Sequence, residues 1–210
     1  MLIALNVVVF LYEITLGPEL RSYVYEWGLL PARVSLALQG GEPAVPAILS
    51  VFSSMFLHGG WMHLLGNMWY LWIFGDNVED RFGHAGFLGF YLASGVASAA
   101  LHVGTHPDSW TPTVGASGAI AGVLGAYLVS YPKARVITLV PLFPFFQVMA
   151  LPAVIVLGLW FVFQFFSGAL ALGMSGAGGV AWWAHVGGFA FGMLVAFVVP
   201  RRREPLRRFE

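Results

Sequence analysis

Long apolar stretches recur along this chain, and almost no charged residues interrupt them. Charged residues make up 10% of the sequence and hydrophobic residues 59%, whereas soluble domains carry about 25% charged residues. A bilayer helix needs about 20 predominantly apolar residues, and each stretch is close to that length or beyond it. The sequence therefore predicts an all-α, polytopic membrane protein with six transmembrane helices. The expected spans are residues 1–16, 47–75, 86–103, 115–131, 147–167 and 184–199.

The segments outside these stretches are expected to lie at the membrane surface. Residues 18–46 are too polar to span and rich in Leu, Val and Trp, which indicates an interfacial loop with short amphipathic helices. The prolines of residues 140–146 break a helix, which predicts a segment along the surface. Residues 200–210 form a basic tail suited to anionic lipid. No separate soluble domain is visible, so we expect residues 1–210 to form a single membrane-embedded domain.

Lysine and arginine fall mostly on one side of the predicted bundle, while only Arg21 and Arg33 fall on the other. Because basic loops mark the cytoplasmic side, we expect both termini to be cytoplasmic and the chain to be a multi-pass protein of a bacterial cytoplasmic (inner) membrane. A formal net charge of zero argues against nucleic acid as a partner. The basic residues on the expected cytoplasmic side are Arg81, Lys133, Arg135, Arg201, Arg202, Arg203, Arg207 and Arg208.

Strongly polar residues inside the spans collect at one depth. His63 and Asn67 are four residues apart and share a helix face. Ser117 opens the fourth span, and His185 stands near the start of the sixth. His63, Ser117 and His185 each lie about 13 to 15 residues from the cytoplasmic end of their span. At the rise of an α-helix this distance is roughly 20 Å for all three. Polar groups at such a depth cost free energy and therefore mark function.

Small residues indicate which helices approach each other. Gly118, Gly122 and Gly125 follow Ser117 in the fourth span, while Gly188 and Gly192 follow His185 in the sixth. Stripes of small residues let two helix backbones pack closely in lipid. We therefore expect the fourth and sixth spans to pair. The fifth span is rich in phenylalanine and poor in small residues, which suits a looser helix beside the second span.

This pairing would let His185 act on Ser117. A serine hydroxyl is a weak nucleophile until an adjacent base takes its proton. Acyl transfer also needs N–H donors aimed at the developing oxyanion, and His63, Asn67 and the backbone N–H of Ser117 are candidates. No Asp or Glu stands at that depth, so a catalytic dyad is expected instead of a triad. This chemistry needs no cofactor.

The polar residues also allow other interpretations. Ser117 taken alone is more often a packing residue in a small-residue helix. His58 and His63 as metal ligands are disfavoured because no carboxylate or thiol accompanies them, so no metal site is expected. A transporter or channel would predict inverted repeats or interrupted helix pairs, and the sequence shows neither. The pair His102 and His106 is expected to be solvated in an outer loop, and the cluster Asp76, Glu79, Asp80 and Arg81 is expected to form local surface ion pairs.

Four segments in order, "HGGWMHLLGN", "GDNVEDRFG", "GASGAIAGVLGAY" and "AWWAHVGGFAFG", resemble the rhomboid family of intramembrane serine proteases. The resemblance covers residues 48–199. It implies a six-helix rhomboid-like bundle with Ser117 as nucleophile and His185 as its base. It also implies that His63 and Asn67 line the oxyanion site, and that His58 has a structural or water-handling role.

The resemblance further implies what the protein acts on. Expected substrates are single-pass transmembrane proteins, cut near the outer membrane face. Non-proteolytic relatives of the same fold bind membrane helices without cutting them, and they usually lack the serine or the histidine. Both residues are present here. The sequence therefore predicts a serine endopeptidase, with a non-proteolytic rhomboid-like protein that binds membrane helices as the alternative.

Overall fold

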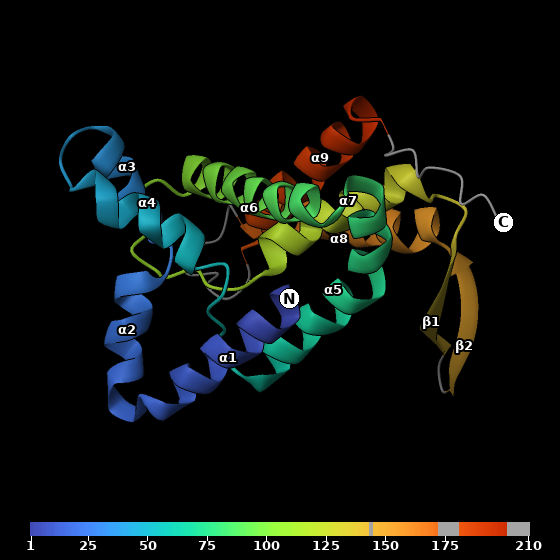
Figure 1. Ribbon diagram of the computed structural model, residues 1–210, viewed down its shortest axis with the longest axis horizontal. Coiled ribbons are helices and arrows are strands. Elements are labelled where there is room, and N and C mark those ends of the chain that lie inside the picture. Colours follow the sequence, from blue (N-terminus) through green and yellow to red (C-terminus); the bar gives the residue numbers. More distant parts are fainter. Residues whose placement is uncertain (143–144, 172–180, 201–210) are drawn as a thin grey trace, which may run out of the picture.

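The computed structural model describes residues 1–142, 145–171 and 181–200. The chain is mostly helical, and its first part forms a side lobe (Figure 1). Helix α1, Leu2–Thr15, is followed by a short 3-10 turn, Gly17–Glu19, and by α2, Leu20–Trp27. Helices α3, Pro31–Leu38, and α4, Ala44–Ser53, complete the lobe. Proline at the first position of α3 suits the start of a helix, where no backbone N–H is needed.

The main bundle consists of α7, Ser117–Ser130, and four helices packed around it. The others are α5, Trp61–Phe82; α6, His84–Thr105; α8, Ala153–Ala171; and α9, Trp182–Val198. Helix α7 contacts α5, α6, α8 and α9, and nearly all of its residues are buried. A helix surrounded in this way must be apolar on every side. Its first residue, Ser117, is therefore the polar group that begins a fully enclosed helix.

Glycines allow α7 and α9 to touch backbone to backbone, and this is the most extensive helix contact of the described residues. A Cβ atom added to Gly192 would lie 2.7 Å from Cα of Gly122, and one added to Gly188 would collide with the carbonyl of Gly118. A Cβ atom on Gly125 would lie 3.0 Å from the backbone nitrogen of Met193. Only hydrogen fits at these positions, so the glycines fix the distance between the two helices.

Arg81 joins three helices at the opposite end of the bundle from Ser117. Its guanidinium donates to Ser130 Oγ at 3.0 Å, at the end of α7. It also donates to the carbonyls of Ala196 and of Val199, the latter at 2.7 Å, at the end of α9. The side chain is buried. The expectation that Arg81 lies at the surface is therefore wrong: the buried arginine satisfies carbonyls that a helix C-terminus leaves without partners.

The helix bounds match the expected spans in part. Helices α1, α6, α7 and α9 begin and end within two residues of the expected bounds. The stretch 47–75 instead divides between α4 and α5, because the chain turns through Gly59 and Gly60. The stretch 147–167 begins as a strand, and α8 starts only at Ala153.

A β-hairpin precedes α8, so the expectation of an all-α chain is corrected. Strands β1, Arg135–Leu142, and β2, Phe145–Pro152, pair antiparallel, with Leu139 opposite Val148. Figure 1 shows the hairpin projecting from the bundle on the side away from the lobe. Pro141 and Pro152 cannot continue a helix, and the β-branched run of β1 favours a strand. Residues 201–210 of the predicted basic tail lie outside the described residues.

Two of the described helices are long and apolar enough to cross a membrane, α6 and α8. A third candidate is α1 taken with the segment Gly17–Trp27, although the two parts are bent by 111°. Helices α4, α7 and α9 are apolar but shorter. The count of six spanning helices stays a prediction.

Candidate active site

The structure brings Ser117 and His185 into hydrogen-bond contact. Ser117 Oγ lies 2.8 Å from Nε2 of His185. Ser117 is the first residue of α7, and His185 lies in the first turn of α9. The histidine is buried and the serine half-buried. The glycine contacts between α7 and α9 begin one residue after Ser117, at Gly118, so the backbone packing sets the separation of the two side chains.

Gln164 completes the surroundings of the histidine. Its Oε1 lies 2.9 Å from Nδ1 of His185, and the side chain is buried in α8. Sequence analysis missed this residue, although a single glutamine within an otherwise apolar stretch is the kind of signal that can find it. The ring of Trp160, also in α8, lies 5.9 Å from the ring of His185. The histidine is therefore held between α7 and α8.

Two side chains of α5 lie against the turn that precedes Ser117. Gly115 has a backbone φ angle of +127°, a value that residues with a side chain rarely adopt. A Cβ atom there would lie 2.7 Å from His63 Nε2 and 3.6 Å from Asn67 Nδ2. Both nitrogens thus face the backbone two residues before the serine. Glycine is needed at 115 for its conformation and for the space it leaves.

His63 Nε2 and Asn67 Nδ2 can each donate a hydrogen bond toward this turn. The backbone N–H of Gly59 donates to His63 Nδ1 at 3.3 Å, which leaves Nε2 to carry the hydrogen of a neutral ring. Asn67 Nδ2 is buried and has no hydrogen-bond partner among the described residues. The backbone N–H of Ser117, in the first turn of α7, has no acceptor within its own helix. Three N–H donors therefore lie close to the turn that precedes the Ser117 side chain.

His58 is buried in the turn before α5. Its backbone N–H donates to the carboxylate of Glu13, in α1, at 3.1 Å, and its Nδ1 lies 3.3 Å from the carbonyl of Phe56. The rings of His58 and His63 meet edge to face at 5.2 Å. This turn is therefore anchored on α1 by Glu13, a second residue that sequence analysis missed, because its partner is a backbone group.

A cavity of about 980 Å³ lies beside the Ser117–His185 pair. His63, Gly115 and residues of α6 also line it. Among them is His102, which is buried and has its Nε2 3.0 Å from Thr113 Oγ1. The expectation that His102 is solvated in a loop is therefore wrong, because α6 continues past it to Thr105.

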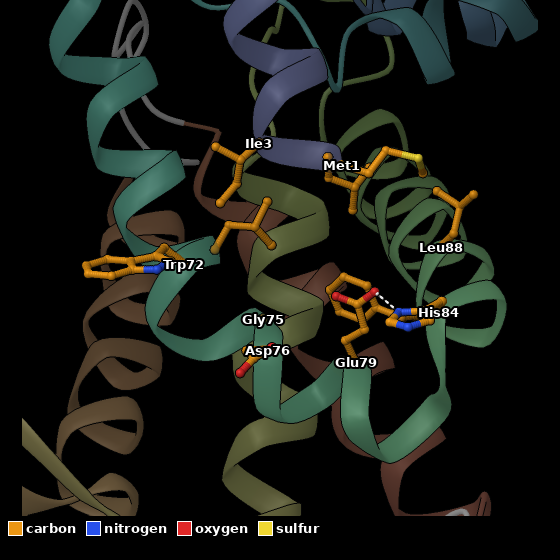
Figure 2. A pocket seen from close by; sticks show the side chains of 11 residues that line it. Met1, Ile3, Trp72, Gly75, Asp76, Glu79, His84 and Leu88 are labelled. Carbon is orange, nitrogen blue, oxygen red and sulfur yellow. Dashed lines mark hydrogen bonds and ion pairs between the residues drawn. The ribbon is translucent and has the colours of Figure 1, made fainter.

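A second cavity, of about 360 Å³, lies at the other end of α5 (Figure 2). It is lined by Trp72, Glu79 and Leu88 and by the start of α1. Glu79 Oε1 lies 2.7 Å from Nδ1 of the exposed His84. Glu79 is 16 residues beyond His63 in the same helix, or about 24 Å along its axis. This cavity is therefore remote from Ser117.

Fold and site together define a helical membrane protein that holds a partly buried serine–histidine pair beside several N–H donors. The comparisons with known proteins give the family. The family model described as "Rhomboid domain" matches residues 46–202, which is most of the chain. The chain belongs to the rhomboid family.

Curated relatives agree with this assignment. The chain is 33% identical over 175 residues to "Presenilin-associated rhomboid-like protein A, mitochondrial" of Danio rerio, covering 79% of this chain and 41% of the relative. It is 33% identical over 171 residues to the presenilin-associated rhomboid-like protein of Homo sapiens, covering 77% and 40%. For "Rhomboid protein 1, mitochondrial" of Saccharomyces cerevisiae the identity is 28% over 175 residues, covering 78% and 45%. The chain spans less than half the length of these relatives.

The names of these relatives correct one expectation. The zebrafish, human and yeast proteins are all named as mitochondrial. The assignment to a bacterial cytoplasmic membrane, with both termini cytoplasmic, is therefore wrong. It rested on the distribution of Lys and Arg, which indicates which side of a membrane a loop occupies but not which membrane it is.

Proposed function

We propose that this protein is an intramembrane serine endopeptidase that cleaves single-pass transmembrane proteins through a dyad of Ser117 and His185. The observation that carries the proposal is the 2.8 Å contact between Ser117 Oγ and His185 Nε2. A serine with an adjacent basic nitrogen is the arrangement that nucleophilic acyl transfer requires. Membership of the rhomboid family supports the same reaction.

In the proposed reaction, His185 Nε2 takes the hydroxyl proton as Ser117 Oγ attacks the carbonyl carbon of the substrate peptide. The C–O bond forms and the carbonyl oxygen becomes an oxyanion. His185 then gives the proton to the leaving amine as the C–N bond breaks. Water from the neighbouring cavity attacks the acyl-enzyme and gives its proton to His185. The bond between the acyl carbon and Ser117 Oγ then breaks, His185 returns the proton to Oγ, and the new C-terminal carboxylic acid leaves.

The donors around Gly115 supply the oxyanion site of this proposal. His63 Nε2, Asn67 Nδ2 and the backbone N–H of Ser117 are held in place before any substrate arrives. Donors fixed in this way lower the barrier without reorganisation, and loss of one such donor costs about 100- to 1,000-fold in kcat. The packing glycines Gly118, Gly122, Gly125, Gly188 and Gly192 act on the reaction only through the position of the two helices.

The expected setting follows from the apolar surface. Leu159, Val162, Phe163 and Phe166 of α8 are exposed, as expected for side chains that face lipid. In this proposal the full bundle spans a mitochondrial membrane with six helices and forms one domain. Transmembrane helices are the proposed substrates, and they reach Ser117 laterally.

Replacement of the nucleophile tests the proposal. In the full chain in liposomes, Ser117→Ala is expected to lower cleavage of a model single-span substrate by at least about 1,000-fold, because the residual rate of such variants comes from binding and the oxyanion site alone. Covalent labelling by a fluorophosphonate should disappear as well. The melting temperature should stay close to that of the original chain.

Ser22→Ala is the matched control, because Ser22 is exposed in α2 and its hydroxyl donates only to the carbonyl of Glu19. This variant should cleave and label normally. Labelling that persists in Ser117→Ala would contradict the proposal. So would an unaltered chain that binds single-span helices but neither cuts them nor reacts with the probe; that result would favour the non-proteolytic alternative.

A further inference from the structure

Gln164 is a buried polar residue in a helix that otherwise presents apolar side chains. Only 6% of it is exposed, whereas its neighbours Phe163 and Phe165 are 62% and 41% exposed. A polar side chain in a spanning helix costs free energy unless it finds a partner. Its side-chain oxygen lies 2.9 Å from Nδ1 of His185. The amide of Gln164 therefore forms its hydrogen bond with the histidine of the proposed dyad.

The hydrogen bond decides where the histidine carries its proton. An amide oxygen can only accept, so Gln164 Oε1 at 2.9 Å requires a hydrogen on His185 Nδ1. A neutral imidazole has one N–H, which leaves Nε2 with a lone pair. Nε2 is the atom that faces Ser117 Oγ. In the other tautomer an N–H would point at the serine and no base would be present.

Gln164 is the recorded hydrogen-bond partner of Nδ1, which in a triad is bound by an aspartate. The nearby ring of Trp160 limits where the imidazole can lie but offers no acceptor for Nδ1 in this contact.

The height of Gln164 on the bundle is fixed by contacts on either side of it. Trp183 Nε1 of α9 donates to the carbonyl of Gly168, one turn later in α8, at 3.1 Å. Phe161, nearly one turn earlier, stacks on Phe189 with ring centroids 4.6 Å apart. These contacts hold the amide opposite the ring of His185.

We infer that Gln164 is a positioning residue that holds His185 in the tautomer able to accept the proton of Ser117. This inference rests on the proposed protease function. The residue acts through the histidine and needs no contact with substrate. Gln164 lies in α8. A helix outside the α7–α9 contact therefore helps determine whether Nε2 of His185 is free to accept a proton.

Three variants of the full chain in liposomes separate this role from packing. Gln164→Met keeps the size but removes the acceptor. It is expected to lower kcat by about 10- to 100-fold, the range found when the orienting partner of a metal-bound histidine is lost, with KM within about twofold. Gln164→Glu keeps an acceptor oxygen and should retain kcat within about tenfold. Leu159→Met, at a residue 65% exposed on the same helix, is the control and should leave kcat and KM unchanged.

A second readout does not depend on activity. With ¹⁵N-labelled histidine, NMR of the unaltered chain should show His185 with a protonated Nδ1 and an unprotonated Nε2, the signal being assigned by its loss in His185→Gln. In Gln164→Met that state should give way to a mixture of tautomers, and Ser117→Ala should keep it.

An unchanged tautomer in Gln164→Met would overturn the inference, and so would a kcat equal to that of the unaltered chain. An unaltered chain that cleaves nothing, but whose His185 tautomer still depends on Gln164, would overturn the protease function alone. It would leave the positioning role supported.

Discussion

Helix α9 meets its neighbours α7 and α8 in different ways. Toward α7 it presents Gly188 and Gly192, so backbone lies on backbone. Toward α8 it presents Phe189 and Trp183, so side chains fill the space. A backbone contact has no side chain that can move to absorb a change, whereas aromatic contacts can be repacked. His185 therefore has one rigid neighbour, which bears Ser117, and one adjustable neighbour, which bears Gln164.

The largest expected effect is on the glycine face. Gly192→Leu should prevent folding, because the added atoms would overlap the backbone of Gly122 and the cost would exceed the roughly 1–3 kcal/mol of ordinary overpacking. Gly158→Leu is the control, since a Cβ atom there meets nothing within 4 Å. Yield of monodisperse protein in detergent and thermal melting measure the difference. Equal melting temperatures for the two variants would show that the α7–α9 contact is not rigid.

A smaller and more closely matched comparison adds one methyl group to each face. Gly188→Ala would collide with the carbonyl of Gly118, while Gly168→Ala on α8 would approach Trp182 Cβ at 3.1 Å. We expect Gly188→Ala to lower the melting temperature by several degrees more than Gly168→Ala, because a 3.1 Å contact needs only a small adjustment whereas the Cβ atom at 188 would overlap a backbone carbonyl. Thermal melting of both variants in the same detergent checks this order, and the reverse order would contradict the comparison.

The smallest expected effect is on the aromatic face. Phe161→Leu removes the stacking on Phe189, and such pairs contribute about 0.5–1.5 kcal/mol beyond the area that they bury. For a chain of this size the melting temperature should fall by roughly 2–5 °C. Thermal melting measures this fall. A loss of folded protein as severe as that of Gly192→Leu would show that the two faces are equally rigid.

The part of the site that follows helix periodicity was predictable from the sequence. Ser117 and His185 each stand at the head of a glycine stripe, and the stripes indicated which helices meet. His63 and Asn67 are four residues apart, which places both on one face of any helix. Such spacing carries information without knowledge of the neighbouring helices, and the structure places all four residues around one turn.

The residues that the sequence did not reveal have partners that only the packing determines. Gln164 faces His185 because of the rotation of α8, and a Phe-rich stretch without a clear apolar stripe does not define that rotation. Glu13 binds a backbone N–H 45 positions later, which no local pattern encodes. The hairpin was missed because an apolar run with prolines excludes a helix without specifying a strand partner.

Arg81 has a mechanical consequence for the site that lies far from it. One guanidinium, at the end of α5, is bound to the ends of α7 and α9, and the opposite ends of these three helices bear Asn67, Ser117 and His185. Over about 20 Å of helix, a tilt of roughly 2° would displace a free end by about 0.7 Å, enough to lengthen a hydrogen bond beyond use. The glycine contacts beside Ser117 and the Arg81 hydrogen bonds at the far ends hold α7 and α9 at two separated points. Two such fixed points oppose a relative tilt of these helices, so Arg81 helps preserve the serine–histidine contact from a distance.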